Sequence, residues 1–331
     1  MHPTEPFTSE LGPFIARHLA LKEALGRRYQ NERAVLTNLD RFLAAQTPGH
    51  RQFNAETFSL WGATFAHLTP TVRRNWMRIA RNLCLYRQRS EPACFLPDLS
   101  GFPRPHQAQR PYLFTEQQIV RLLHAADGLK PTSTSPLYGQ GLRLAIVLLY
   151  TSGLRRGELV RLTLGDYDAG GRALLIRDTK FHKSRLVPLS LDAAREMNGY
   201  LQVRYQLSHA ADAPLLCNRH GALRPYSGTG LAQGLRRLFE QAGITTAQGR
   251  LPRIHDLRHT FAHHALGRWY RAGVDVQAKL PALAAYMGHV SVISTQHYLG
   301  SFEPFALAAS ERFADHCAPW LTTNAADGGV L

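Results

Sequence analysis

Two arginines are the side chains in this sequence best suited to chemistry at a phosphate, because a guanidinium group presents a planar fork of donors that matches two phosphate oxygens. Arg155 follows Gly153, a residue that can form a tight turn before a helix. Glu158 lies three positions after Arg155, on the same helical face, where it could orient the arginine. Taken alone, Arg155 and Glu158 are equally typical of a surface ion pair.

The segment Ile-His-Asp-Leu-Arg-His holds the other arginine. His255 and Arg258 share one face of a helix, so the histidine could move a proton while the arginine binds an anionic oxygen. His255 and His259 also have the spacing of a zinc-binding helix. That motif needs glutamate after the first histidine, and Asp256 stands there instead, with no clear third ligand following. We therefore expect no metal and no other cofactor.

Two lysines lie in a polar turn between two short segments that are typical of strands. The segments are 173–177 and 185–189, and the turn at 178–184 contains Lys180 and Lys183. A hairpin tip can carry a compact, rotatable cation into a DNA groove. An exposed basic turn with no such role would have the same pattern.

A fourth segment, Tyr-Met-Gly-His-Val-Ser, precedes a tyrosine. Gly288 and His289 predict a turn at the start of a helix, and Tyr298 follows nine residues after His289. A single tyrosine is usually a core or interface residue. Tyr298 therefore gains significance only in combination with the other three segments.

Before residue 92 the sequence predicts helices, over 14–24, 32–45 and 71–89. In the last of these, one apolar stripe is formed by Val72, Trp76, Ile79, Leu83 and Tyr86. Arginines occupy other positions of the same helix. They could contact DNA phosphates or form an ordinary solvated face, and they are Arg73, Arg74, Arg78 and Arg81.

Prolines concentrated around 92–111 exclude regular helix and indicate a linker. Beyond it we expect a mainly α domain with a small β-sheet. A helix is predicted at 115–126, where Thr115 and Gln118 form a capping pattern. A loop at 131–141 and a second helix at 142–150 are predicted to follow. The predicted organisation is a helical domain at 8–92, a linker at 93–110, a second domain at 111–303 and a tail at 304–331.

The charge of the chain favours a nucleic-acid partner. Lys and Arg number 39 against 24 Asp and Glu, a formal net charge of +15, which attracts polyanions. No apolar run approaches the ~20 residues of a membrane-spanning helix. The polar N-terminus does not resemble a signal peptide, and the four cysteines have no metal-like spacing. We expect a cytoplasmic protein that acts at the nucleoid, with no membrane partner.

In their order along the chain, the four segments resemble one family. The Gly-Leu-Arg-x-x-Glu-Leu box, the Lys-x-x-Lys-x-Arg-Leu-Val-Pro-Leu hairpin, the His-x-x-Arg-His box, the Gly-His box and the final Tyr are similar to those of the tyrosine recombinases, the phage-integrase type. The resemblance covers about residues 111–299. It implies a helical core-binding domain and a catalytic domain that together form a C-shaped clamp on DNA.

The resemblance also implies a role for each matching residue. Arg155 and Arg258 would clamp the non-bridging oxygens of the scissile phosphate, with Glu158 supporting the first arginine. Lys180 would be the general acid for the 5′-oxygen, with Lys183 as the second candidate. His255 would be the acid/base partner, and His289 would hydrogen-bond a phosphate oxygen. Tyr298 would be the nucleophile that becomes a 3′-phosphotyrosine.

The implied activity is site-specific recombination of double-stranded DNA without metal or ATP, for integration, excision or transposition of a mobile element. The implied assembly is a homotetramer on synapsed sites, weakly associated or monomeric off DNA, with room for accessory recombinases or DNA-bending proteins. The tail at 304–331 could be exchanged between protomers. Alternatives are relaxation of DNA by a type IB topoisomerase, a catalytically inactive DNA-binding accessory protein, and a zinc hydrolase built on His255 and His259.

One interval departs from the compact chromosome-dimer resolvases of the family. The stretch between Arg258 and His289 is longer, with the additional residues around 269–281. This favours a recombinase of a mobile element over a housekeeping resolvase.

Overall fold

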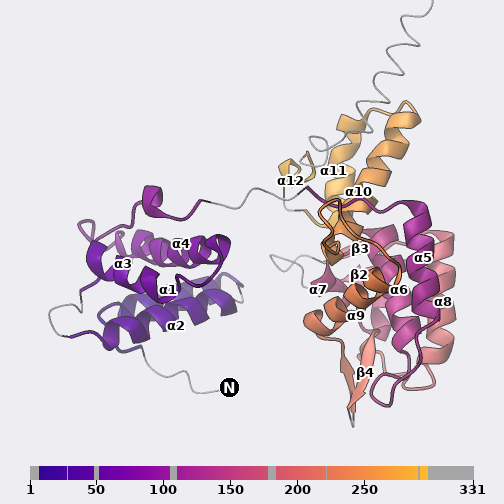
Figure 1. The fold of residues 1–331 in the computed structure, drawn as a ribbon, viewed down its shortest axis with the longest axis horizontal. Coiled ribbons are helices and arrows are strands. Elements are labelled where there is room, and N and C mark those ends of the chain that lie inside the picture. The colour runs from indigo at the N-terminus through magenta and orange to yellow at the C-terminus, as the bar shows by residue number, and fades with distance from the viewer. Residues whose placement is uncertain are drawn as a thin grey trace, which may run out of the picture. The chain divides into compact units, whose positions relative to one another are not determined.

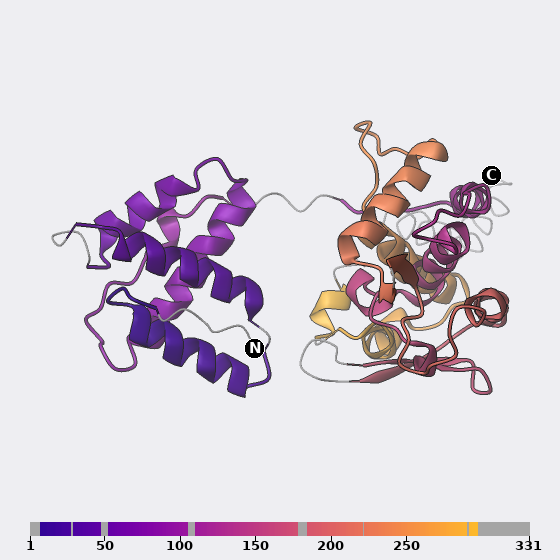
Figure 2. The same ribbon diagram turned by 90° about the horizontal axis from the view of Figure 1, so that it is seen from below.

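The computed structural model describes residues 7–27, 29–47, 52–104, 110–177, 184–220, 222–289 and 291–296. The chain divides into two compact units, Met1–Gln109 and Arg110–Leu331 (Figures 1 and 2). No helix in the described segments is both long and apolar enough to cross a membrane.

The first unit is helical and is built around an aromatic core. Trp61 is fully buried, and its indole N–H donates to Asn38 Oδ1 at 2.9 Å, which satisfies the polar atom that the ring brings inside. The rings of Phe65 and Trp76 pack against it. The described helices of this unit are α1 (Gly12–Ala24), α2 (Gln30–Ala44), α3 (Ala55–Thr64) and α4 (Pro70–Arg87).

The helices predicted at 14–24, 32–45 and 71–89 are confirmed as α1, α2 and α4, each within two residues at either end. Helix α3 was not predicted, although its start carries a local signal. Asn54 Oδ1 accepts from the Thr57 backbone N–H at 3.0 Å, and Thr57 Oγ1 accepts from the Asn54 N–H at 2.9 Å. This is a capping box, with Thr57 in the place of the usual glutamate or glutamine.

Helix α4 packs part of the predicted stripe inward and buries more residues than predicted. Leu83 is buried and Trp76 and Ile79 are partly buried against the helical core, whereas Val72 is 37% exposed. Three further residues of the helix are also buried: Met77, Ala80 and Cys84. Helix α4 packs against α1 and α2. The small side chains at 80 and 84 allow close approach of these neighbours, so packing extends the buried face beyond the predicted stripe.

Part of the proline-rich segment packs on the first unit. Phe102 is only 5% exposed and joins the helical core. Two arginines of α4 fasten the same segment, because Arg74 donates to the Pro103 carbonyl at 2.9 Å and Arg81 to the Pro97 carbonyl at 3.0 Å. The chain therefore leaves this unit after Phe102, about ten residues later than the density of prolines suggests.

The second unit is mainly helical with small sheets, which confirms the predicted fold class. An antiparallel sheet has the order β1-β2-β3, and a separate hairpin pairs β4 with β5. That hairpin projects from the opposite end of the unit to α11 (Figure 1). The described elements are α5 (Glu116–Asp127), α6 (Tyr138–Ser152), α7 (Arg156–Leu159), β1 (Tyr167–Asp168), β2 (Ala173–Ile176), β3 (Arg185–Pro188), α8 (Leu191–Arg204), β4 (Cys217–His220), β5 (Ala222–Pro225), α9 (Gly228–Gln241), α10 (Ile254–Arg271), α11 (Val276–Met287) and α12 (Ile293–Gln296).

Two predictions for this unit were incomplete. The loop expected at 131–141 ends early, because α6 begins at Tyr138, where Gly139 and Gly141 are buried and allow close approach. The hairpin β4–β5 lies where mainly helix was expected, and its strands are too short to leave a clear alternation. The capping box of α5 is confirmed: Gln118 N–H donates to Thr115 Oγ1 at 3.2 Å.

The turn between α6 and α7 requires glycine. Gly153 ends α6 with a φ of 59°, in the left-handed region that favours a residue without a Cβ. A Cβ at this position would lie 2.5 Å from Phe261 Cδ1 of α10. The turn can therefore lie against α10. Arg155 belongs to this turn and directly follows Leu154.

The substitution Gly153→Ala is expected to lower the free energy of unfolding by about 3 kcal/mol, since left-handed backbone strain adds to a clash with a core ring. Gly243→Ala is a matched control, because Gly243 has a φ of 62° but no atom within 4 Å of the new Cβ. It should cost about 1 kcal/mol. Urea unfolding measures both changes. An equal decrease in the free energy of unfolding would show that the contact with Phe261 does not contribute to the cost.

Candidate active site

Arg155 is held by three contacts at the start of α7. Its backbone N–H donates to Glu158 Oε2 at 2.9 Å, and its Nη1 donates to Glu158 Oε1 at 2.7 Å. Its Nη2 donates to the Gly288 carbonyl at 2.6 Å. The side chain is still 33% exposed, so the guanidinium is fixed in direction and remains accessible to an anion.

Arg258 lies in the first turns of α10 and is 1% exposed. Its Nη1 donates to the Gly153 carbonyl, and its Nη2 donates to the Met287 carbonyl at 2.8 Å. These two acceptors are neutral, so they orient the cation without cancelling its charge. A buried positive charge anchored in this way is stabilised further when an anion binds to it.

The end of α11 is where both arginines converge. The carbonyls of Met287 and Gly288 accept from Arg258 and Arg155 respectively. We predicted Gly288 and His289 at the start of a helix, and the structure corrects this: Gly288 terminates α11 with a φ of 70°. Glycine commonly ends helices in this conformation, which leaves the last carbonyls of α11 free to receive donors from outside the helix.

His289 follows this turn and lies close to the positive charges. Its Nδ1 is 2.7 Å from Thr295 Oγ1, a hydrogen bond that fixes the plane of the ring. Burial, and then the charges of Arg258 and Arg155, lower the pKa of His289 to about 4. The imidazole is therefore neutral at neutral pH and suited to hydrogen bonding.

His255 lies one turn before Arg258 on α10 and reaches solvent. Partial burial of its ring, and then the charge of Arg258, lower its pKa. A neutral imidazole can accept a proton. The fold thus brings four of the predicted residues together from three separate segments: Arg155, His255, Arg258 and His289.

Arg185 is a residue of this site that the sequence reasoning missed. Its Nη1 and Nη2 donate to the two oxygens of Glu158 at 3.1 and 2.9 Å, and its Nε donates to the Tyr286 carbonyl at 2.9 Å. Glu158 is 3% exposed and accordingly holds Arg155 and Arg185 together. The sequence did contain a signal for it, because Arg185 is the arginine of the Lys-x-x-Lys-x-Arg motif and lies two residues after Lys183.

Burial by itself would raise the pKa of Glu158. The hydrogen bonds and charges of Arg185 and Arg155 outweigh it and lower the pKa to about 2. Glu158 is therefore ionised at any ordinary pH. The ion pair that was indistinguishable from a surface pair in sequence is a buried anion between two cations.

Three predicted residues lie outside the described part of the chain: Lys180, Lys183 and Tyr298. The strands that flank the lysine segment are described and form the predicted hairpin, with Ile176 paired to Arg185. Since Arg185 also contacts Glu158, the end of this hairpin is attached to the site.

The four arginines predicted to contact DNA all lie on α4 of the first unit. Arg78 is exposed, and Arg73 is partly buried. Arg74 and Arg81 donate to backbone carbonyls of the segment that follows α4, so packing occupies part of each guanidinium. Of the four, only Arg78 is exposed rather than partly buried.

The histidine pair behind the zinc alternative packs ring against ring. His255 and His259 have centroids 4.7 Å apart at an interplanar angle of 85°. Burial, and then the charge of His255, lower the pKa of His259 to about 3. Within the described residues, no three His, Cys, Asp or Glu side chains gather as metal ligands would.

Comparison with known proteins gives a match over most of the second unit. Residues 113–303 match the phage integrase family. The chain is 32% identical over 298 residues to y4rB of Sinorhizobium fredii, which is named as an integrase/recombinase; the alignment covers 86% of this chain and 91% of the relative. It is 33% identical over 269 residues to tyrosine recombinase XerC 2 of Ralstonia nicotianae, covering 80% of this chain and 67% of that protein.

Solved structures share the fold. The Tn1549 transposon integrase in complex with transposon right end DNA has a TM-score of 0.63 at 19% identity, covering 92% of this chain and 99% of that one. The XerH site-specific recombinase bound to a palindromic difH substrate has a TM-score of 0.60 at 16% identity, covering 87% and 78%.

The depressed pKa of Glu158 predicts how its contribution to stability depends on pH. A carboxyl whose pKa falls from 4.5 to about 2 on folding contributes about 3 kcal/mol above pH 4.5, and this is lost as the pH falls toward 2. Glu158→Gln should therefore be less stable than wild type at pH 7, and the difference should shrink below pH 4.5. Urea unfolding at several pH values measures it.

Glu196→Gln is the matched control for this substitution. Glu196 also pairs with an arginine, Arg143, but its side chain is 33% exposed. Removing its charge should cost less than about 1 kcal/mol, as for other exposed pairs. If the two variants lose the same stability, or if the Glu158 difference does not change with pH, the buried anion does not hold the site together.

Proposed function

Because the chain belongs to the phage integrase family of tyrosine recombinases, we propose that it is a site-specific recombinase. In this proposal it cuts and rejoins duplex DNA through a covalent bond between Tyr298 and a DNA phosphate. The biological setting we propose is integration, excision or transposition of a mobile element. The integrase/recombinase name of its relative y4rB and its long interval between Arg258 and His289 support this.

The observation that carries the proposal is the convergence of two arginines on the end of α11. Arg155 and Arg258 are anchored by the carbonyls of Gly288 and Met287, so their remaining donors are fixed in direction before any substrate arrives. Preorganised cations of this kind stabilise the charge that develops on a five-coordinate phosphorus, and each such donor is worth a few kcal/mol in systems where one has been removed.

In the proposed reaction, side chains of the protein accept and donate every proton that moves. The phenol oxygen of Tyr298 attacks the phosphorus while His255, held neutral by its surroundings, takes the phenolic proton. The bond from phosphorus to the 5′-oxygen breaks, and Lys180 supplies that oxygen with a proton. His289 hydrogen-bonds a phosphate oxygen. The phosphotyrosine conserves the phosphodiester bond energy, so rejoining by a 5′-hydroxyl requires neither ATP nor metal.

We propose double-stranded DNA as the partner of both units, with α4 of the first unit contributing Arg78 and its neighbours. Recombination of two sites would use a homotetramer, weakly associated off DNA. The segment 304–331 is a candidate for exchange between protomers. We propose that the domains predicted at 8–92 and 111–303 are the core-binding and catalytic domains. We propose that the protein acts in the cytoplasm, on DNA at the nucleoid.

Covalent capture tests the proposal. DNA that flanks the gene is nicked near candidate inverted repeats and incubated with wild type or Tyr298→Phe, in EDTA and without ATP. We expect an SDS-resistant protein–DNA complex with wild type and none with the variant, because phenylalanine lacks the nucleophilic oxygen. Lys180→Ala should form the complex at least tenfold more slowly, since the leaving oxygen lacks its acid.

Other outcomes have distinct meanings. Equal capture by wild type and Tyr298→Phe would refute the assignment of the nucleophile. Capture that requires a divalent metal would point to different chemistry, including the zinc alternative. Relaxation of any supercoiled plasmid, without discrete products, would indicate a type IB topoisomerase.

A further inference from the structure

A groove beside the candidate active site carries more positive charge than the proposed chemistry uses. It has a volume of about 490 Å³ and runs between α7, α9 and the start of α10. Apolar residues form part of its lining, among them Leu149 and Leu154. Arg155 and His255 line it together with three further arginines: Arg156 on α7, Arg236 on α9 and Arg253 directly before α10.

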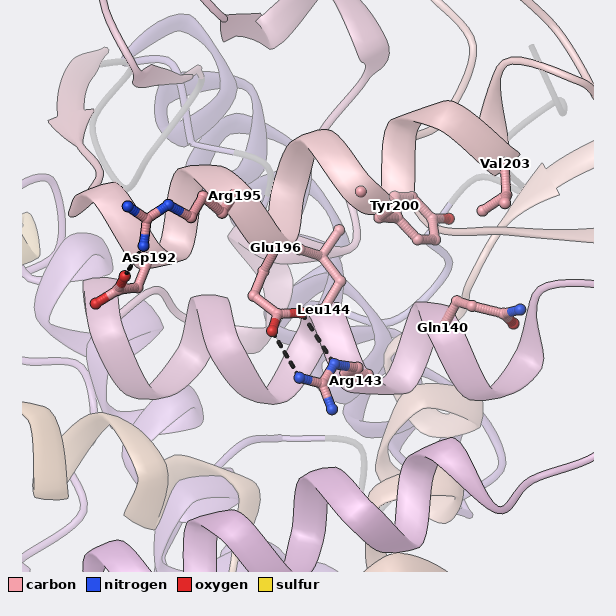
Figure 3. Close-up of a pocket in the computed structure, with 9 residues that line it drawn as sticks. Gln140, Arg143, Leu144, Asp192, Arg195, Glu196, Tyr200 and Val203 are labelled. Carbon is pink, nitrogen blue, oxygen red and sulfur yellow. Dashed lines mark hydrogen bonds and ion pairs between the residues drawn. The ribbon is translucent and has the colours of Figure 1, made fainter.

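Among the described residues, no carboxylate lines this groove, whereas carboxylates line two other pockets of the same unit. In the pocket between α6 and α8, each arginine faces an acid (Figure 3). Arg143 forms two hydrogen bonds with Glu196, at 2.9 and 2.6 Å, and Arg195 contacts Asp192 at 2.8 Å. That pocket is close to neutral, whereas the groove presents cations.

The arginines of the groove are available to an anion. Arg156 and Arg236 are exposed, and neither guanidinium has a hydrogen bond or ion pair with another described residue. Arg253 pairs with Asp256 at 2.8 Å but is 48% exposed. Separate exposed cations around a concave surface repel one another, and a polyanion that neutralises several at once removes that cost.

The position of the groove identifies the anion. Arg155 and His255 belong both to the groove and to the candidate active site, so the groove continues directly from the place where the scissile phosphate would bind. Each strand of B-DNA carries a phosphate about every 3.4 Å along the helix axis. A strand with one phosphate on Arg155 therefore has its next phosphates within reach of the groove.

We infer that this groove is a binding subsite for the backbone phosphates next to the scissile phosphate, with Arg156 and Arg236 as their ligands and Arg253 at the edge. The inference rests on the proposed function, and it adds two residues to which no catalytic role is given. Contacts with flanking phosphates fix the register of the strand without reading its sequence. They would thereby position the reacting phosphorus between Arg155 and Arg258.

Salt dependence of DNA binding tests the groove without any chemistry. Arg156→Ala and Arg236→Ala are made in the full-length Tyr298→Phe protein and titrated onto a fluorescent duplex between about 50 and 200 mM salt. Each should reduce the slope of log K against log salt by about 0.9, the value for one lost phosphate contact. Arg237→Ala is the control, because Arg237 is an exposed neighbour on α9 that does not line the groove.

Covalent capture on modified DNA identifies the phosphate. Duplexes carry a neutral methylphosphonate at one position at a time beside the cleaved bond. In the wild type, one flanking methylphosphonate should slow capture about tenfold, the effect of losing one charged hydrogen bond. The same methylphosphonate should have little further effect in Arg156→Ala or in Arg236→Ala, because the contact is already absent.

The inference is overturned if both groove variants behave like Arg237→Ala in the salt titration, or if every flanking methylphosphonate slows the groove variants as much as it slows wild type. The proposed function alone would be refuted if wild type forms no covalent complex while the groove variants still show a smaller salt slope than Arg237→Ala.

Discussion

A single buried carboxylate organises the candidate active site. Glu158 accepts hydrogen bonds from the guanidinium groups of both Arg155 and Arg185, and it also accepts from the Arg155 backbone N–H. Through these contacts it joins the turn before α7 to strand β3 of the β2–β3 hairpin. Removal of one member of such a buried pair leaves an uncompensated charge, so each of these segments depends on the others for its position.

Backbone carbonyls complete the positioning of the cations in the site. Glu158 pairs with Arg155 and Arg185, whereas the carbonyls of Gly288 and Met287 orient Arg155 and Arg258 without adding negative charge. The same positive field, added to burial, keeps His289 neutral with a pKa of about 4. An excess of fixed positive charge around neutral imidazoles suits a substrate that brings its own negative charge. The groove lined by Arg156 and Arg236 extends this excess away from the reacting centre.

Local spacing in the sequence was sufficient for much of the fold. The 3.6-residue periodicity predicted α1, α2 and α4, and the positions of His255 and Arg258 placed both on one face of α10. Gly153 was predicted at a tight turn and has the positive φ that such a turn requires. Helix α3 and the β4–β5 hairpin were missed because short elements leave little periodicity, and the stripe that α4 buries depends on its neighbours.

The sequence by itself determined the residue types, their order and the family they resemble, since a motif needs only spacing along the chain. Tertiary structure decided which groups meet. Arg155 reaches the carbonyl of Gly288, 133 residues away, and Arg185 on β3 reaches Glu158 on α7. Packing also directed Arg74 and Arg81 onto the chain that follows α4. Such contacts depend on how distant elements pack, and spacing along the chain does not encode that.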